Sequence, residues 1–344
     1  MVKSYKNIYL STLLFTAVIS FTQNTFAQSS DNSRLEEVIV TADFYDSTLT
    51  SIPSSITVID SAAIEQRNAT HLEDLFGLSP NVNFTTGASR GRFIQIRGIG
   101  ERSEFIEPVN YSVGVLIDGI DFTGISTAAS TLDIQQVEVF KGPQGTSIGA
   151  NAMAGFINLT STGTGAAQDS KLRLELGNYG LKQLAGAFGG DIGNDAQFRF
   201  SASKLEGDGY IENTFLGRKD TNGFDELTIR AAVDAQVTNE YKVSAVLHKF
   251  DIDNGYDAFS LDLNRTTLSD EPGFDRQDTT AFGLTQEYSG LDNVDVKLFV
   301  SLSDSDLEYG YDEDWSYVGI APGWEYSSID HYYRDRTANQ IDFS

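Results

Sequence analysis

The second half of the chain, from about residue 165 onward, alternates apolar and polar residues with a period of two. This is the pattern of β-strands that present one apolar face. The clearest segment is ELTIRAAVDAQV at 226–237: one face carries Leu227, Ile229, Ala231, Val233, Ala235 and Val237, and the other carries Glu226, Thr228, Arg230, Ala232, Asp234 and Gln236. Eight strands are predicted, near 170–178, 181–190, 196–206, 226–237, 240–250, 278–289, 294–304 and 331–343. Each has about ten residues, the length that crosses a bilayer at a tilt.

The connections between these strands alternate in length. After the first hairpin, short turns such as TNE and GLDN alternate with long loops at 207–225, 251–277 and 305–330. Outer-membrane barrels have short periplasmic turns and long external loops. The pattern therefore predicts antiparallel transmembrane β-barrel strands over residues 166–344. A soluble β-sandwich is the alternative, but it rarely confines its long loops to one end.

The residues before these strands, 53–165, mix short strands with helical segments. The pattern predicts short strands at SITVID, FIQIRGIG, VGVLIDGI and the end of LDIQQVEVFKG. It predicts helical segments at AAIEQ and HLEDLFG. Ser61 is the predicted N-cap of the first piece, and Gly77 is the predicted C-cap of the second. The pattern predicts a compact mixed α/β domain of about 110 residues, a common domain size.

The N-terminus has the three parts of a secretory signal peptide: Lys3 and Lys6, an apolar core, and small residues at 25 and 27. We predict a signal peptide at 1–27, cleaved after Ala27, and a flexible segment at 28–52. A membrane anchor is the alternative, but the apolar core is short for a span of about 20 residues. The chain is therefore expected to be exported.

Composition narrows the function. The formal net charge of −25 argues against nucleic-acid binding, which needs a basic face. The chain has no cysteine, and its three histidines are far apart in sequence, so no metal site and no cofactor are predicted. We see no nucleophile–base pair in the sequence that would indicate an enzyme, so no enzymatic activity is predicted.

The long loops are acidic and aromatic. Their carboxylates read as a solvated surface, with Ca²⁺ binding as the alternative. Tyr311, Trp315 and Trp324 are candidate ligand contacts, although aromatic residues also form girdles at membrane interfaces.

The stretch VEVFKGPQGTSIGANAMAGFINL at 137–159 resembles the plug signature of TonB-dependent outer-membrane receptors. FIQIRGIG and VGVLIDGI are similar to two other plug strands of that family. The matching positions are Arg97, Gly98, Asp118, Gly119, Glu138, Gly142, Pro143, Gln144, Gly145, Gly149, Asn151, Gly155 and Asn158. We expect a structural role for them, because glycine permits tight turns and close approach of the plug backbone to the barrel wall.

The segment EVIVTA is similar to the TonB box of the same family; its residues are Glu37, Val38, Ile39, Val40, Thr41 and Ala42. An extended β-branched segment can add as a strand to a partner's sheet. An ordinary first strand is the alternative.

The resemblance implies a transporter in the bacterial outer membrane that imports a scarce nutrient such as a ferric siderophore. Haem, cobalamin and oligosaccharide stay open as substrates. Its implied partners are TonB with the inner-membrane energising complex, outer-membrane lipid and a small nutrient ligand. An exported β-rich adhesin or carbohydrate-binding protein is the rival class. A signalling receptor would need a further domain before residue 37.

Barrels of this family have about 22 strands, whereas eight are predicted here. The chain is therefore expected to be a fragment, with an open, curved sheet beside the plug; a naturally short barrel is the alternative. An eight-stranded barrel has room only for side chains, not for a plug.

Overall fold

The computed structural model describes residues 39–40, 47–48, 54–86, 88–102, 108, 110–125, 128–145, 151–166 and 169–344. The signal peptide predicted at 1–27 lies outside these ranges. No helix within them is long and apolar enough to cross a membrane.

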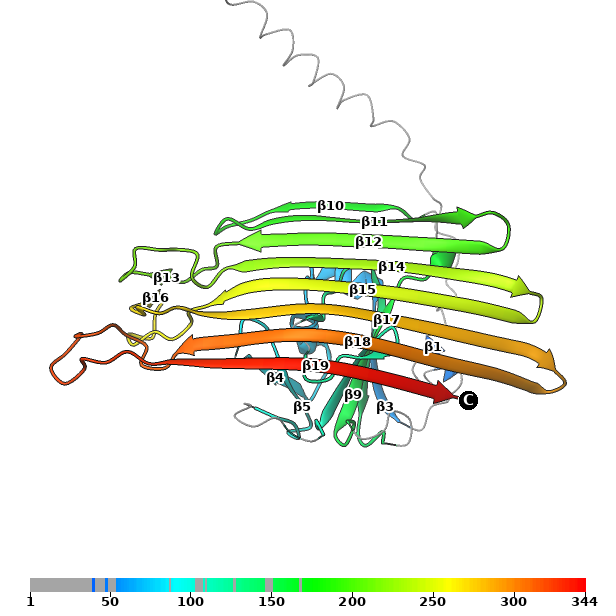
Figure 1. Cartoon of the computed structure of the whole chain (residues 1–344), viewed down its shortest axis with the longest axis horizontal. Helices are drawn as coiled ribbons and strands as arrows, with labels where there is room; N and C mark the ends of the chain where they lie inside the picture. Colours follow the sequence, from blue (N-terminus) through cyan, green and yellow to red (C-terminus); the bar gives the residue numbers. More distant parts are fainter. Residues whose placement is uncertain are drawn as a thin grey trace, which may run out of the picture. The chain divides into compact units, whose positions relative to one another are not determined.

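Eight long strands form one sheet in which every neighbouring pair is antiparallel. In sheet order they are β10 (Lys171–Leu176), β11 (Lys182–Ile192), β12 (Ala196–Gly207), β14 (Phe224–Thr238), β15 (Tyr241–Tyr256), β17 (Gly273–Leu291), β18 (Val294–Asp312) and β19 (Ile329–Phe343). The predicted number of strands is confirmed. The sheet is open, because β10 and β19 lie at its two edges (Figure 1).

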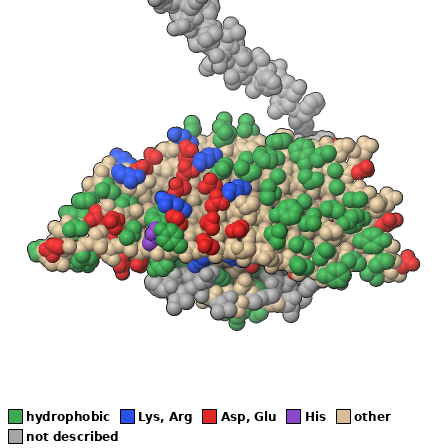
Figure 2. All heavy atoms as spheres, in the orientation of Figure 1, with side chains coloured by type: hydrophobic (Ala, Val, Ile, Leu, Met, Phe, Trp, Pro, Cys, Tyr) green, Lys and Arg blue, Asp and Glu red, His purple; other side chains and the backbone are tan. Residues whose placement is uncertain are grey.

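The two faces of this sheet have the predicted chemistry. Val233 on the apolar face of β14 is 39% exposed, whereas Arg230 on its polar face is 7% exposed and points toward the N-terminal domain. Figure 2 shows the apolar side chains gathered over the half of the outer face nearer the short turns. Acidic and basic side chains form a band between these apolar residues and the long loops. The outer face is therefore built for an apolar environment over about half of its height.

The strands run further toward the long loops than predicted, so the loops shrink to 208–223, 257–272 and 313–328. The alternation continues there with charged side chains outside. Arg276 of β17 contacts Asp253 of β15 at 2.7 Å and Glu308 of β18 at 3.2 Å. Because the polarity of these residues resembles that of loops, the sequence alone placed the strand ends too early.

Residues 55–166 form the mixed α/β domain. Its main sheet has the order β3 (Ser55–Asp60), β8 (Ile134–Lys141), β9 (Gly155–Ser161), β6 (Val113–Ile117) and β7 (Ile120–Asp121), and only β6 and β9 run parallel. A second pair joins β4 (Val82–Thr85) to β5 (Phe93–Ile96). The helical segments are α2 (Ser61–Gln66) and the 3-10 helices η1 (Leu72–Leu78) and η3 (Thr164–Ala166).

Both predicted helix caps are wrong by one or two residues. Asp60 caps α2, because its Oδ1 accepts the Ala63 N–H at 2.8 Å, and Ser61 is the first helical residue. Gly77 lies inside η1, whose C-cap is Ser79. A carboxylate competes well with a hydroxyl for the N-cap, which explains the first error.

One apolar core joins the domain to the sheet. Phe122 and Ile120 of the domain belong to the same buried cluster as Phe250 of β15, Ala281 of β17 and Leu307 of β18. The Phe122 and Phe250 rings meet edge to face, with centroids 5.5 Å apart. The domain is therefore packed on the sheet rather than tethered to it.

Two glycines of the predicted signature show why this residue is required. Gly155 has φ +145°, and a Cβ there would lie 2.0 Å from the Phe140 carbonyl oxygen. This close approach is between two strands of the domain, so the expectation of approach to the barrel wall is wrong at this position. Gly119, with φ +81°, does face the wall: a Cβ would lie 3.3 Å from the Phe299 ring of β18.

We predict that Gly155→Ala destabilises the domain by ~3 kcal/mol or more, because it adds a backbone clash to a strained φ. The measurement is the urea concentration at which the domain becomes sensitive to protease in detergent-solubilised protein. Gly163→Ala is the control, because no atom lies within 4 Å of a Cβ there. Equal midpoints for the two variants would contradict the β8–β9 packing.

Candidate functional site

The domain meets the polar face of the sheet through buried charged residues. These contacts come from its loops 88–92, 118–119, 133 and 162–166, and they reach strands β12, β14, β15 and β17. They form three clusters at successive heights of the sheet. Buried charges are costly unless they are paired, so each cluster fixes a specific docking geometry.

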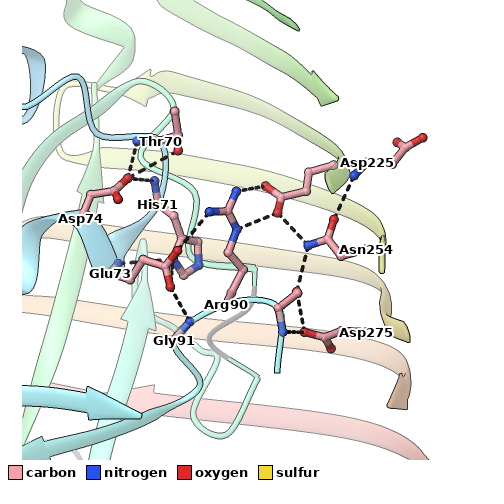
Figure 3. A network of polar contacts seen from close by, with 11 residues as sticks. Thr70, His71, Glu73, Asp74, Arg90, Gly91, Asp225, Asn254 and Asp275 are labelled. Atoms are coloured by element: carbon pink, nitrogen blue, oxygen red, sulfur yellow. Dashed lines mark hydrogen bonds and ion pairs between the residues drawn. The ribbon is translucent and has the colours of Figure 1, made fainter. Parts of the chain in front are cut away.

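The first cluster is centred on Arg90. Its Nε and Nη2 donate to Glu226 Oε1 and Oε2 of β14 at 2.7 and 3.0 Å, and its Nη1 donates to Glu73 Oε1 at 3.0 Å (Figure 3). Arg90 is 6% exposed. Burial opposes its charge, but the two carboxylates outweigh burial and raise the pKa of Arg90 above its usual range. The guanidinium is thus a permanent two-sided clamp between domain and sheet.

Asn254 of β15 links this clamp to Asp275 of β17. Its Nδ2 donates to Glu226 Oε1 at 2.8 Å and to Ser89 Oγ at 3.0 Å. The Ser89 N–H and hydroxyl donate to Asp275 Oδ2 at 3.0 and 2.7 Å, and Arg92 Nη2 contacts Asp275 Oδ1 at 2.6 Å. Three adjacent strands therefore hold the short loop 88–92 of the N-terminal domain, as Figure 3 shows in part.

The second cluster is centred on Asp118, in the turn between β6 and β7. Its Oδ2 lies 3.1 Å from Arg230 Nε of β14 and 3.0 Å from His248 Nε2 of β15. Its carboxylate also accepts the Ser161 N–H and hydroxyl, both at 2.8 Å. Burial alone would raise the pKa of Asp118, but His248 and Arg230 hold it well below its usual range. Asp118 is therefore ionised, and this residue of the predicted plug signature connects the domain to strands β14 and β15.

The third cluster is a fully buried ion pair. Arg199 of β12 donates from Nε and Nη2 to the Asp133 carboxylate at 2.6 and 2.7 Å, and its side chain is 0% exposed. Arg199 Nη1 also donates to the Ala166 carbonyl at 2.8 Å. Nearby, Thr164 donates to Asp234 Oδ2 of β14 at 2.6 Å. These contacts fix the segment that leads from the domain into the first long strand.

Most other signature residues hold the domain together internally. Asn158 Nδ2 donates to the fully buried Glu138 at 3.1 Å, and Asn151 Oδ1 accepts the Tyr111 N–H at 3.2 Å. The Gly142 and Gln144 N–H groups donate to carbonyls 154 and 152, with Pro143 and Gly145 in the same turn. Arg97 and Gly98 form a turn with φ of +54° and +81°. Gly149 lies outside the described residues.

Two residues of the predicted TonB box have a described backbone. Ile39 and Val40 form β1, which pairs antiparallel with β2 (Ser47–Thr48). The remaining residues, Glu37, Val38, Thr41 and Ala42, lie outside the described ranges.

The three ligand candidates have different surroundings. Tyr311 donates to Asp330 at 2.7 Å and packs on Phe259, which also stacks on Trp315 with ring centroids 4.8 Å apart. Trp324 stacks only on its neighbour Tyr326, and these two side chains are 45% and 52% exposed. The structure therefore leaves Trp324 as the most accessible of the three candidates.

The acidic loops hold no group of three or more metal-ligating side chains within the described ranges. Asp257 instead accepts from Asn213 and Thr267, both at 2.9 Å, where β13 (Glu212–Asn213) of one loop pairs with β16 (Thr266–Thr267) of the next. At least one acidic residue of the loops, Asp257, therefore holds two loops together.

Sequence reasoning missed Arg90, Arg92, Asn254 and Asp275 as interface residues. One signal was present: Glu226, Arg230 and Asp234 recur on the polar face of a strand whose other face is apolar. Charges on that face need partners inside the barrel, but the sequence does not say which plug residues supply them.

Comparisons with known proteins agree with this architecture. Residues 48–156 match the family model of the TonB-dependent receptor plug domain. The vitamin B12 transporter BtuB of Vibrio vulnificus is 25% identical over an alignment of 340 positions, which covers 94% of this chain and 48% of the relative. The pesticin receptor of Yersinia enterocolitica is 29% identical over 108 residues, which are 31% of this chain and 16% of the relative.

Solved structures show the same fold. The siderophore receptor PiuA of Acinetobacter baumannii has a TM-score of 0.66 at 18% identity, over 86% of this chain and 43% of that one. The ferric yersiniabactin uptake receptor FyuA of Yersinia pestis has a TM-score of 0.63 at 19% identity, over 75% and 42% of the two chains.

The fold and its buried interface define a plug domain packed on the polar face of barrel-type strands. Together with the matches, they support a TonB-dependent receptor. The chain spans about half the length of this BtuB. From here on we call residues 55–166 the plug.

We predict that Arg90→Met lowers the free energy of plug unfolding by about 3–5 kcal/mol, because it leaves two carboxylates buried without their cation. Arg218→Met is the matched control: Arg218 binds Asp220 with the same two-bond geometry, at 2.9 and 3.0 Å, but the side chains are 53% and 57% exposed. The control should lose less than ~1 kcal/mol. Urea unfolding monitored by protease sensitivity measures both; equal losses would refute the interface as the anchor.

A second prediction concerns pH. His71 caps η1 by accepting the Glu73 N–H at 3.3 Å on Nδ1, and burial lowers the pKa of His71 below its usual value. The unfolded chain binds a proton near pH 6.5 while the folded plug resists it, so stability falls as pH drops below that value, by up to ~1.4 kcal/mol per pH unit.

His71→Asn keeps an accepting cap but removes this titration. We expect the variant to lose less stability than the parent between pH 7.5 and 5.5 in the same urea assay. Parallel losses for the two proteins would show that His71 does not contribute to the pH dependence.

Proposed function

We propose that this receptor takes part in TonB-driven import of a scarce nutrient across the bacterial outer membrane. The buried ionic interface between plug and sheet is the observation that carries the proposal. It supports a plug that seals the interior of a barrel and that must be displaced by work before a ligand passes. We propose no catalytic residue and no cofactor.

The outer loops 208–223, 257–272 and 313–328 are the proposed ligand-receiving surface. They lie at the end of the sheet away from the turns 193–195, 239–240 and 292–293, and they carry the exposed Trp324–Tyr326 pair. The names of the similar proteins include vitamin B12 and ferric siderophore receptors. A ferric siderophore is our first candidate substrate; cobalamin, haem and oligosaccharide are alternatives. The match to a receptor plug model disfavours an adhesin.

Residues 37–42 are the proposed docking segment for TonB. The segment precedes β3, which is an edge strand of the plug sheet and pairs only with β8. Tension applied to residues 37–42 would therefore reach β3 before the buried clusters. We also propose a signal peptide at 1–27, cleaved after Ala27, which would deliver the protein to the outer membrane.

A peptide binding assay tests the TonB partnership. A peptide spanning residues 30–46 should bind the periplasmic domain of TonB with micromolar affinity. Val38→Pro should abolish binding, because proline removes a backbone donor and restricts the preceding residue. Val38→Thr is the matched control, because it keeps the β-branched shape and the N–H. Binding that is indifferent to Val38→Pro, or absent with the parent peptide, would refute the docking segment.

A further inference from the structure

We infer that the loop 313–328 receives a cationic ligand, or the cationic part of a ligand, that presents a flat face. The inference rests on the proposed function, in which this loop belongs to the ligand-receiving surface. It names a class of substrate within that function: small organic cations and metal chelates that carry a positive group.

The first observation is an exposed aromatic pair. The Trp324 and Tyr326 rings lie 5.8 Å apart at an interplanar angle of 19°, and both are about half exposed. Val318 on the same loop is 53% exposed and Ile329 at its end is 40% exposed. Four other aromatic residues of these loops are stacked in pairs: Trp315 on Phe259, and Tyr317 on Phe215. Tyr210 of loop 208–223 is a single exposed ring, 56% exposed. Among the stacked pairs of the described loops, Trp324–Tyr326 is the one whose two rings come from the same loop and are both at least 45% exposed.

The second observation is the charge around this pair. The loop contains Glu313, Asp314 and Glu325 but no lysine or arginine. Aromatic faces attract cations, and nearby carboxylates add to that attraction. A solvated acidic surface accounts for the carboxylates alone, but it does not account for exposed apolar rings among them.

The third observation is that basic residues of the described outer loops are already engaged. Arg218 binds Asp220 at 2.9 Å, Lys219 lies 3.8 Å from Glu212, and Arg265 donates to the Tyr179 hydroxyl at 2.7 Å. Loops 208–223, 257–272 and 313–328 contain no other lysine or arginine. An anionic ligand such as a ferric tricatecholate would therefore meet the carboxylates of loop 313–328 with no basic residue of that loop to hold it.

The chain allows a direct test, because Trp315 and Trp324 are its only two tryptophans. In Trp315→Phe protein, fluorescence reports on Trp324 alone. The probes are three quenchers with one flat ring and different charge: 1-methylnicotinamide (a cation), nicotinamide (neutral) and nicotinate (an anion). Each quenching constant is divided by the value for free N-acetyltryptophanamide under the same conditions.

We expect the normalised quenching to follow the order cation, neutral, anion, with at least about a twofold difference between the first and the last at low salt. The difference should collapse when ionic strength rises from about 0.01 M to about 0.5 M. Equal quenching by the three probes, or stronger quenching by nicotinate, would overturn the inference.

Two charge variants locate the effect. Glu325→Gln, beside Trp324, should reduce the preference for the cation. Glu287→Gln is the control, because Glu287 lies near the opposite end of β17 and pairs with Lys297 at 3.6 Å. It should leave the preference unchanged. An equal effect of both variants would show that overall net charge, and not this loop, produces the preference.

The ligand class is then tested on iron chelates. The probes are a trihydroxamate iron(III) chelate with a free ammonium group, the same chelate with that amine acetylated, and a tricatecholate iron(III) chelate. We expect the ammonium form to quench Trp324 at the lowest concentration. Tightest binding of the tricatecholate would overturn the inference. These assays do not involve TonB, so failure of the TonB-peptide assay would remove the proposed import and leave this charge selectivity standing.

Discussion

The pairing of buried charges between plug and wall is the constraint on which the rest of the structure depends. An ion removed from water must find a partner, and here the partners come from segments far apart in the chain: Arg90 and Glu226, Asp118 and Arg230, Asp133 and Arg199. Breaking any one of these pairs leaves an uncompensated charge, so sliding the plug by one residue along the wall is costly. The apolar core around Phe122 and Phe250 adds affinity, but it has far less directional preference.

The same constraint explains the sequence of the strands. The strands separate an apolar exterior from an interior that, on β12, β14, β15 and β17, presents ionisable groups to the plug. A period of two places these chemistries on opposite faces. The outer apolar face ends before the strands do. Beyond it, cross-strand pairs such as Arg276 with Asp253 and Glu308 carry the hydrogen-bonded ladder toward the loops. Strand length is therefore set by backbone pairing, while the apolar face ends where the outward side chains change from apolar to charged.

The difference between the length of the strands and the extent of their apolar face shows what could be predicted from the sequence. The eight strands and the two faces of 226–237 follow from local periodicity, and the plug follows from the stretch at 137–159 together with two shorter segments. The strand ends near 256 and 312 could not be predicted from periodicity, because Asp253 and Glu308 are polar like loop residues but pair across strands. The partners of Arg90 and Arg92 could not be predicted, because Glu226 and Asp275 lie more than a hundred residues away. Asp118 could be recognised as a turn residue, but its role in binding the wall appears only when β14 and β15 are placed beside it.

The outer loops and the plug are connected by contiguous packing. Trp315 stacks on Phe259, Phe259 meets Tyr256, and Tyr256 meets Tyr309. The Arg92 guanidinium lies 5.3 Å from the centre of the Tyr309 ring and binds Asp275 at 2.6 Å. Contiguity by itself is not coupling, which requires an element with two arrangements that both sites bias. The plug loop 88–92 lies where both sites could bias it, because it touches the aromatic residues below the loops and the buried carboxylates of the wall. A shift of these loop aromatic residues would therefore act on Arg92, which is two residues from the Arg90 clamp and binds Asp275 of the wall.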